Sequence, residues 1–307
     1  MTRWLDGSIP RFPMDIQKYL VAAKQEVDRR LDRLLPGESE EPATIHRAMR
    51  YSVFAGGKRV RPILVLASGE SIGGPRQTLI QLGAAIEMLH TYSLIHDDLP
   101  ALDNDDLRRG VPTCHKVFGE AIAVLAGDSL MTRCYQVLVD LPGVSDNTRL
   151  AILREITTAS GTIDGMIGGQ VVDIESEGKE ISPDILEYIH RSKTGALLAS
   201  CARCGALAAG ADELQMKSLS DYGRDIGLAF QIVDDILDIT SSSEVLGKTP
   251  GKDAKVKKAT YPALYGIGAS REKARELTNA AVDSVRGLGA AAEPLRGIAQ
   301  FILNRTT

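Results

Sequence analysis

The sequence contains few aromatic residues and carries almost no net charge, and both features narrow the possible function. Aromatic residues make up 5% of the 307 residues, and only one is a tryptophan. Strands are enriched in aromatic and β-branched residues, so this composition, rich in alanine and leucine, favours helices over sheet. A formal net charge of −4 provides no overall basic field of the kind that binds nucleic acid.

Cysteines and long apolar runs are also scarce. Four cysteines in a chain of this length, without an export signal, fit a reducing cytoplasm. Cys201 and Cys204 form a C-x-x-C pair, but no second pair completes a zinc site, and we expect the pair to pack within a helix. No apolar run reaches membrane-spanning length, and residues 1–13 lack the apolar region of a secretory signal. We therefore expect a cytoplasmic protein without a membrane span.

Helical periodicity dominates the chain. Apolar residues recur at three- and four-residue spacing, and Gly or Pro interrupts most runs. The pattern predicts helices over residues 16–35, 44–54, 62–69, 79–98, 121–141, 148–167, 183–189, 194–209, 214–238, 262–267, 271–288 and 292–304. No shift in composition marks a domain boundary. We predict an all-α protein in which a loose N-terminal tail, residues 1–14, precedes a single helical-bundle domain, residues 15–307, of about a dozen helices.

Two aspartate-rich segments stand out, and each follows an apolar helical run. The first acidic cluster spans residues 97–106 and the second spans residues 234–238. Carboxylates packed so densely raise one another's pKa unless a cation compensates. Mg²⁺ prefers oxygen ligands and is typically held by a few carboxylates together with substrate phosphates. An acidic surface loop is the alternative for the first cluster, but the second is too apolar in its surroundings for that explanation.

The spacing within each cluster determines whether its carboxylates can converge. Asp234 and Asp238 are separated by one helical turn and share a face. Asp97 and Asp103 are six residues apart, which an ideal helix would place about 120° from each other. Pro100 disfavours helical geometry at the residue before it. We therefore expect the chain to bend there and bring Asp103 back toward Asp97.

Basic residues occur near both clusters. Lys58 and Arg61 follow the turn Gly56-Gly57 at a predicted helix start, where cations are otherwise disfavoured, so their presence beside backbone N–H donors suits a phosphate. Arg108 and Arg109 follow the first acidic cluster, and arginine matches phosphate oxygens in a bidentate manner. These positions predict anion-binding groups that are separate from the carboxylates.

Three further segments carry candidate ligand contacts. His90 lies seven residues before the first cluster on the same helix face, although a lone histidine there is more often structural. Lys193-Thr194 opens a predicted helix. Gly247-Lys248-Thr249 resembles the end of a Walker A loop but lacks its first glycine and a preceding strand, which excludes that motif. Lys248 remains a candidate contact in a basic loop. Together, two carboxylate sets and two basic sets on apolar helices fit two anionic substrates with hydrophobic tails.

Five motifs occur in one order that is typical of a known family. They are Gly56-Gly57-Lys58-Arg59-Val60-Arg61-Pro62, the Asp97–Asp103 segment with Leu107-Arg108-Arg109-Gly110, Gly169-Gln170 with Asp173, Lys193-Thr194, and Phe230-Gln231 with Asp234, Asp235 and Asp238. From about residue 44 onward the chain resembles the trans-isoprenyl diphosphate synthases, and most closely the bacterial farnesyl diphosphate synthases (geranyltranstransferases). The resemblance implies an isoprenoid synthase fold, an all-helical bundle around a deep central cavity, and a homodimer.

The resemblance also implies a reaction and a set of residues. The reaction is the Mg²⁺-dependent head-to-tail (1′-4) condensation of isopentenyl diphosphate with dimethylallyl or geranyl diphosphate to give farnesyl diphosphate. Isopentenyl diphosphate would be held by Lys58, Arg61, His90 and Arg109, and the allylic diphosphate by Arg108, Lys193, Gln231 and Lys248. Asp97 and Asp103 would bind two Mg²⁺ ions with Asp98 in support, and Asp234 a third near Asp238. Lys193 and Thr194 would lie beside the developing carbocation, so the implied catalytic set is Asp97, Asp103, Arg108, Lys193 and Thr194.

Product length is expected to depend on the helix that carries Asp97. Tyr92 and Ser93 lie five and four residues before Asp97, about 6–8 Å along the helix axis. A bulky Tyr92 would form a floor that stops elongation near fifteen carbons, whereas ordinary core packing is the alternative. Relatives that make twenty-carbon products tend to have a smaller or more flexible residue at that place.

Other activities are less consistent with these residues. A geranylgeranyl diphosphate synthase is the alternative within the same family. A class I terpene cyclase has no second diphosphate for Lys58 and Arg61 to hold. A non-catalytic subunit would be expected to lose one acidic cluster, and a metal-binding scaffold without chemistry would not release diphosphate.

Overall fold

The structure is a computed structural model that describes residues 14–240 and 260–305. The helices are α1 (Ile16–Leu34), α2 (Ala43–Phe54), α3 (Val60–Glu70), α4 (Arg76–Asp97), α5 (Cys114–Phe118), α6 (Glu120–Val139), α7 (Asp146–Ser160), α8 (Met166–Ser176), α9 (Pro183–Ile189), the π-helix η1 (His190–Gly195), α10 (Ala196–Ala208), α11 (Glu213–Thr240), α14 (Tyr261–Ser284), the 3₁₀ helix η2 (Arg286–Ala292) and α15 (Glu293–Leu303). In the described part, the only sheet is a hairpin of β1 (Leu107–Arg108) and β2 (Val111–Pro112). The all-α prediction is confirmed.

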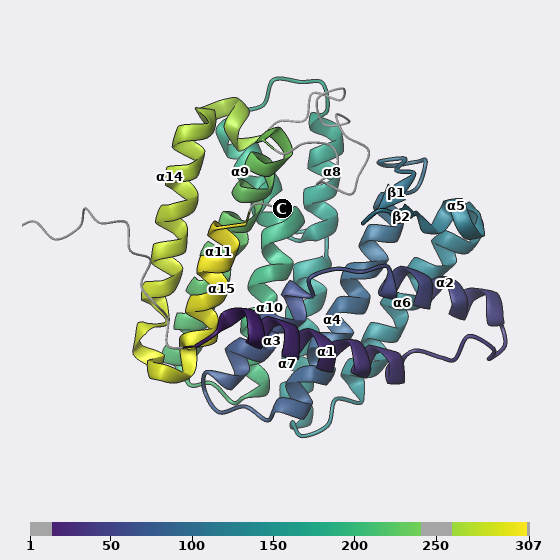
Figure 1. The fold of residues 1–307 in the computed structure, drawn as a ribbon, viewed down its shortest axis with the longest axis horizontal. Helices are drawn as coiled ribbons and strands as arrows, with labels where there is room; N and C mark the ends of the chain where they lie inside the picture. The colour runs from purple at the N-terminus through teal and green to yellow at the C-terminus, as the bar shows by residue number, and fades with distance from the viewer. Residues whose placement is uncertain (1–13, 241–259, 306–307) are drawn as a thin grey trace, which may run out of the picture.

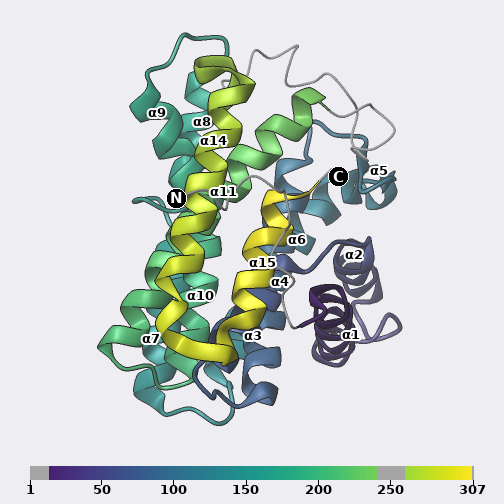
Figure 2. The same ribbon diagram turned by 60° about the vertical axis from the view of Figure 1, so that its left-hand side comes forward.

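The helices form one bundle in which α4 and α10 occupy the interior (Figure 1). Helix α4 packs against α6 on one side and α3 on another, while α10 packs against both α3 and α11. Figure 2 shows α14 running along α11, with α15 beside them. Helix α1 crosses the other helices and contacts α3, α4 and α15. Helix α4 is largely buried, in agreement with its sequence, which is apolar on most faces.

One predicted helix is divided in the structure and one predicted break is displaced, and a glycine explains each difference. The predicted helix over residues 148–167 ends at Ser160, and α8 starts separately at Met166. A Cβ at Gly165 would lie 2.5 Å from the Thr158 carbonyl oxygen, so the chain makes a tight turn there that needs glycine. The break predicted between residues 262–267 and 271–288 is present within α14, where Gly266, with the non-helical φ of 80°, divides the helix, although it falls inside the first predicted range.

Cys201 and Cys204 are buried and unbonded to each other within α10, as the packing interpretation predicted. Helix α6 is, among the described residues, the one helix long and apolar enough to cross a membrane, although no apolar run of that length was expected. The core helix of a soluble protein can have the same length and hydropathy, and α6 packs against α4.

The division between a tail and a domain at residue 15 stays a prediction, because residues 1–13 lie outside the described residues.

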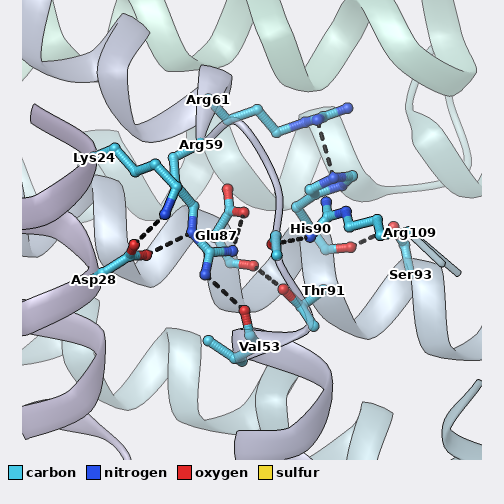
Figure 3. A network of polar contacts seen from close by, with 11 residues as sticks. Lys24, Asp28, Val53, Arg59, Arg61, Glu87, His90, Thr91, Ser93 and Arg109 are labelled. Carbon is cyan, nitrogen blue, oxygen red and sulfur yellow. Dashed lines mark hydrogen bonds and ion pairs between the residues drawn. The ribbon is translucent and has the colours of Figure 1, made fainter. Parts of the chain in front are cut away.

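A buried arginine fixes the start of α3 (Figure 3). Arg59 is only 3% exposed and adopts a left-handed conformation with φ 54°. Its Nε donates to Asp28 on α1 at 2.8 Å, and its Nη1 donates to Glu87 on α4 at 2.9 Å. Its Nη2 donates to the Val53 carbonyl of α2 at 2.7 Å. The Arg59 side chain therefore connects α3 to α1, α2 and α4. Lys58 and Arg61 lie next to this connection in the sequence.

Removal of the Glu87 carboxylate should destabilise this junction. Glu87 is 2% exposed, so Glu87→Ala leaves a buried guanidinium with Asp28 as its remaining carboxylate partner. We expect a loss of about 3 kcal/mol in the free energy of unfolding, measured by urea denaturation. The control is Glu187→Ala, which breaks an exposed pair with Arg191 and should cost less than about 1 kcal/mol. Equal losses in the two variants would contradict a special role for the buried network.

Candidate active site

The first acidic cluster bends back on itself at the end of α4. The helix ends at Asp97, and the amide of Asp103 donates to the Asp97 carbonyl at 2.8 Å. The amide of Asp105 donates to the Asp98 carbonyl at 3.2 Å, and Asn104 takes a left-handed conformation with φ 48°. The bend predicted from Pro100 is therefore present, and it brings the backbone of Asp103 next to that of Asp97.

An internal ion pair holds the loop after this bend. Asp98 is 3% exposed, and the Nε of Arg108 donates to its two carboxylate oxygens at 2.9 and 3.2 Å. The Nη2 of Arg108 lies 3.7 Å from the Asp105 carboxylate. Arg108 thus joins the hairpin strand β1 to the end of α4. Its expected contact with an allylic diphosphate stays a prediction, and so does the supporting role of Asp98 toward a metal.

Asp97 lies in an electrostatically costly position. Burial raises the pKa of its carboxyl group, Asp103 and Asp98 raise it further, and Lys193 and Arg108 act in the opposite direction. The ammonium group of Lys193 is itself bound to Asp173 on α8 at 2.7 Å. Side chains from α4, β1 and η1 therefore meet here. A divalent cation at this point would compensate the carboxylates.

The π-helix η1 presents two of the predicted residues, Lys193 and Thr194. Single π-turns are rare and often occur at functional sites. A Cβ at Gly169 would lie 2.3 Å from the amide nitrogen of Lys193, so only glycine allows α8 to approach η1 this closely. Asp173, one turn further along α8, then reaches Lys193. The sequence motif contained Asp173, but its role as the partner of Lys193 was not foreseen.

The second acidic cluster contains two carboxylates with different surroundings. Asp235 is 5% exposed and accepts hydrogen bonds from Gln231 at 2.9 Å and from the Tyr261 amide at 2.8 Å. His190 of η1 lies 3.2 Å from the same carboxylate. Asp235 therefore joins α11, α14 and η1 as a structural anchor. The predicted contact of Gln231 with a diphosphate stays a prediction.

Asp234, the predicted metal ligand of the second acidic cluster, forms an ion pair with an arginine in this structure. The Nη1 of Arg305 lies 3.0 Å from its carboxylate, and the Arg305 guanidinium stacks 4.6 Å from the Phe230 ring centroid. Asp238 lies one turn further on and is exposed. Arg305 was not among the predicted residues, because nothing in the sequence indicates that the segment after α15 reaches α11.

Arg61, from the start of α3, and Arg109 act on His90. The Nη1 of Arg61 lies 3.1 Å from His90 Nε2, as Figure 3 shows. Burial, followed by the charges of Arg61 and Arg109, lowers the pKa of His90 well below its usual value, so the ring is neutral at pH 7. Burial also lowers the pKa of Arg61 and of Arg109. Desolvation and Arg305 lower the pKa of Lys58, while Asp234 acts in the opposite direction.

The position of the Arg109 side chain explains why residue 57 of the first motif is a glycine. Its guanidinium lies against Gly57 and donates to the Gly56 carbonyl. A Cβ at Gly57, which has φ 114°, would lie 2.4 Å from Arg109 Nη1. The two glycines thus place Arg109 of the hairpin beside the start of α3. The structure brings Arg61, His90 and Arg109 together, whereas the charges that act on Lys58 are those of Arg305 and Asp234; the role of all four residues in binding isopentenyl diphosphate stays a prediction.

The carboxylates suit Mg²⁺ but do not complete a site by themselves. Among the described residues, no three His, Cys, Asp or Glu side chains converge as a ready-made metal centre. Mg²⁺ commonly keeps water and binds through one or two carboxylates plus substrate phosphates. The costly burial of Asp97 beside Asp103 is the observation that supports such an ion here. Lys248 lies outside the described residues.

The two residues predicted to set product length lie on α4 near Asp97. Tyr92 is 6% exposed, and burial, followed by Tyr135 and Asp97, raises its pKa to about 12. Because Tyr135 belongs to α6, the Tyr92 ring lies at the interface of α4 and α6. The Ser93 hydroxyl donates to the His90 carbonyl at 2.8 Å.

The motifs and geometry agree with known proteins. The family described as polyprenyl synthetase matches residues 42–287. The chain belongs to this family. Over 298 residues it is 44% identical to farnesyl diphosphate synthase of Escherichia coli (strain K12), which covers 95% of this chain and 99% of that protein. It is also 44% identical over 298 residues to geranylgeranyl pyrophosphate synthase 4 of Arabidopsis thaliana, covering 96% of this chain and 79% of that protein.

Solved structures agree as well. An apo crystal structure described as an FPP/GFPP synthase from Zymomonas mobilis superposes with a TM-score of 0.84 at 36% identity, covering 94% of this chain and 98% of that chain. The prediction of a trans-isoprenyl diphosphate synthase is confirmed at the level of the family, and this polyprenyl synthetase is a prenyltransferase. The relatives include enzymes named for fifteen- and twenty-carbon products, so the product length is a separate question.

The cost of burying Asp97 predicts a stability effect opposite to that of most core changes. Because the folded-state pKa is raised, the ionised carboxylate destabilises the folded protein at pH 7. Without divalent cations, Asp97→Asn should melt about 2 °C higher than the wild type in scanning calorimetry. The difference should shrink as the pH falls through the raised pKa, since the wild type then becomes neutral too. Mg²⁺ with a diphosphate should raise the Tm of the wild type only, and a destabilised variant would contradict this assignment.

Proposed function

We propose that this enzyme is a farnesyl diphosphate synthase that condenses isopentenyl diphosphate head-to-tail with dimethylallyl and geranyl diphosphates. The observation that carries the proposal is the buried ring of Tyr92, five residues before Asp97 at the interface of α4 and α6. The farnesyl diphosphate synthase of E. coli is similar over nearly its whole length, which supports it.

In this proposal the two diphosphates occupy separate sets of residues. Isopentenyl diphosphate binds to the basic set of Lys58, Arg61 and Arg109, with neutral His90 against Arg61. Burial lowers the pKa of both arginines, and a bound diphosphate would compensate their desolvated positive charges. The allylic diphosphate lies between the acidic clusters, where Arg108, Lys193, Gln231 and Lys248 contact it.

In this proposal, Mg²⁺ binds together with the allylic diphosphate. Asp97 and Asp103 would hold two Mg²⁺ ions and Asp234 a third, and bound Mg²⁺ supplies charge stabilisation for the leaving diphosphate. Arg305 now occupies one side of the Asp234 carboxylate, so it must move or share that carboxylate when an ion binds. Asp98 and Asp235 stay engaged with protein partners and keep the two clusters in place.

The reacting carbons lie between these two sets of residues. The allylic C–O bond breaks and its electron pair leaves with the diphosphate, whose charge Lys193 and Arg108 stabilise. The carbonyls of Lys193 and Thr194 and the Thr194 hydroxyl face the resulting carbocation. The double bond of isopentenyl diphosphate attacks it, a new C–C bond forms, and the departed diphosphate takes the proton that is lost. Exclusion of water protects the cation from capture.

A geranylgeranyl diphosphate synthase is the second candidate. It is favoured by plant relatives of that name, such as the Arabidopsis enzyme, at the same identity. A class I terpene cyclase is less consistent with the structure, because a cyclase binds one diphosphate and would have no use for the cations gathered around His90.

Product analysis tests the proposal. With dimethylallyl and isopentenyl diphosphates and Mg²⁺, the wild type should release mainly fifteen-carbon product, measured by mass after dephosphorylation. Tyr92→Ala should make products of twenty carbons or more its main products, because the pocket below Asp97 deepens. Tyr92→Phe keeps the ring and is the matched control, with a wild-type spectrum expected. A wild type that releases mainly twenty-carbon product would favour the second candidate, and an unchanged Tyr92→Ala spectrum would exclude the floor.

We also infer a cytoplasmic homodimer. Helices α6 and α7 pack together, and they and the following turn expose large apolar side chains: Leu125 is 53% exposed, Val139 56%, Leu150 63% and Ile163 80%. Such a surface on a bundle helix suits a second copy of the chain. The four buried, unbonded cysteines support a reducing compartment. Light scattering should give twice the chain mass for the wild type and one chain mass for Leu125→Glu; a monomeric wild type would contradict the dimer.

A further inference from the structure

The ring of Tyr92 is supported from one side by a histidine of the next helical turn. Tyr92 and His96 are four residues apart on α4, so their side chains are neighbours on one face. Their rings meet edge to face, with centroids 5.5 Å apart and an interplanar angle of 88°. This geometry is the preferred one for aromatic pairs, and it limits how far the tyrosine ring can tilt. The orientation of Tyr92 therefore depends on where His96 is held.

His96 is in turn held by α6. Its Nε2 lies 3.0 Å from the Val124 carbonyl, which can only accept, so this nitrogen carries the proton and donates. The imidazole lies over Gly127, where a Cβ would come within 2.2 Å of Nε2 and 2.5 Å of Cδ2. Gly127 is buried, and its lack of a side chain leaves the notch that accepts the ring. The Asp128 carboxylate of α6 lies 3.8 Å from Nε2.

We propose that His96, seated in the Gly127 notch of α6, is a positioning residue that fixes Tyr92 as the floor of the product pocket and thereby sets product length. This inference rests on the proposed function, because it assumes that Tyr92 stops elongation. It adds a second requirement, which is that the His96 ring must hold the Tyr92 ring in place from the side. His96 touches neither the metal site nor the Asp97 carboxylate in any recorded contact among the described residues, so its contribution is to specificity.

The direction of the effect follows from the geometry. Without the imidazole, the Tyr92 ring loses its edge contact and can tilt into the space that His96 leaves. A longer product then passes a floor residue that is still tyrosine. A methyl group at position 127 would force the imidazole out of the notch and break its hydrogen bond to Val124. The His96 side chain is already 26% exposed, so it can turn toward solvent. We therefore expect the Gly127→Ala variant to fold.

The experiment compares products of His96→Ala and Gly127→Ala with those of Tyr92→Ala and the wild type. Each enzyme receives geranyl diphosphate and excess isopentenyl diphosphate with Mg²⁺, and products are resolved by carbon number. The ratio of twenty- to fifteen-carbon product should rise about tenfold in His96→Ala, the size of effect that one methylene group has on discrimination in an apolar pocket. Gly127→Ala should shift the ratio in the same direction. In the His96→Ala background, Gly127→Ala should add nothing, because the two changes act through one contact.

The controls separate this inference from a general loss of stability. Gly268→Ala makes the same chemical change on α14, where a Cβ meets no atom within 4 Å, and its product ratio should match the wild type. Calorimetry establishes that each variant is folded, and a merely structural role would lower Tm and rate without a change in product length. Longer products from Tyr92→Ala alone, with His96→Ala and Gly127→Ala unchanged, would overturn the inference and leave the proposed floor intact. Unchanged products from Tyr92→Ala would overturn both.

Discussion

The buried ion pair between Arg59 and Glu87 is the interaction on which the arrangement of the site depends. It closes the start of α3 onto the middle of α4, and the bond from Arg59 to Asp28 adds α1. Burying an unpaired guanidinium would be costly, so the geometry of Lys58 and Arg61 is fixed relative to α4. The same helix carries His90, Tyr92 and Asp97 within about two turns. A single rigid helix thus holds part of the basic set, the proposed pocket floor and the first acidic cluster.

Charge is distributed around this helix in two separate groups. The acidic clusters bind cations of the protein itself, Arg108 at Asp98 and Arg305 at Asp234, while Lys193 binds Asp173 of α8. Burial lowers the pKa of Arg61 and of Arg109 near His90, so an anion there would compensate their charge. Metal-bound allylic diphosphate suits the first environment and a bare diphosphate suits the second. This separation explains how one bundle can hold two diphosphates in different roles, which a cyclase does not need.

The sequence allowed much of this arrangement to be predicted, because its motifs depend on local geometry. Pro100 predicted the bend that returns Asp103 to Asp97, and the helical spacing of α4 and α11 was clear from their apolar patterns. Contacts between distant segments could not be predicted. Nothing near Arg59 in the sequence points to Glu87, and Arg305 gave no sign that it reaches Asp234. The break between α7 and α8 was missed because isolated glycines are compatible with a helix until tertiary contacts select a turn.

We propose that the two diphosphates bind to two different sets of residues. A crystal structure of the enzyme with Mg²⁺, isopentenyl diphosphate and the non-ionising thiolo analogue of geranyl diphosphate would test this separation. We expect the isopentenyl diphosphate group among Lys58, Arg61 and Arg109, and the analogue with Mg²⁺ between Asp97, Asp103 and Asp234. Isopentenyl diphosphate bound at the acidic clusters, or an allylic diphosphate bound without metal at these aspartates, would contradict it.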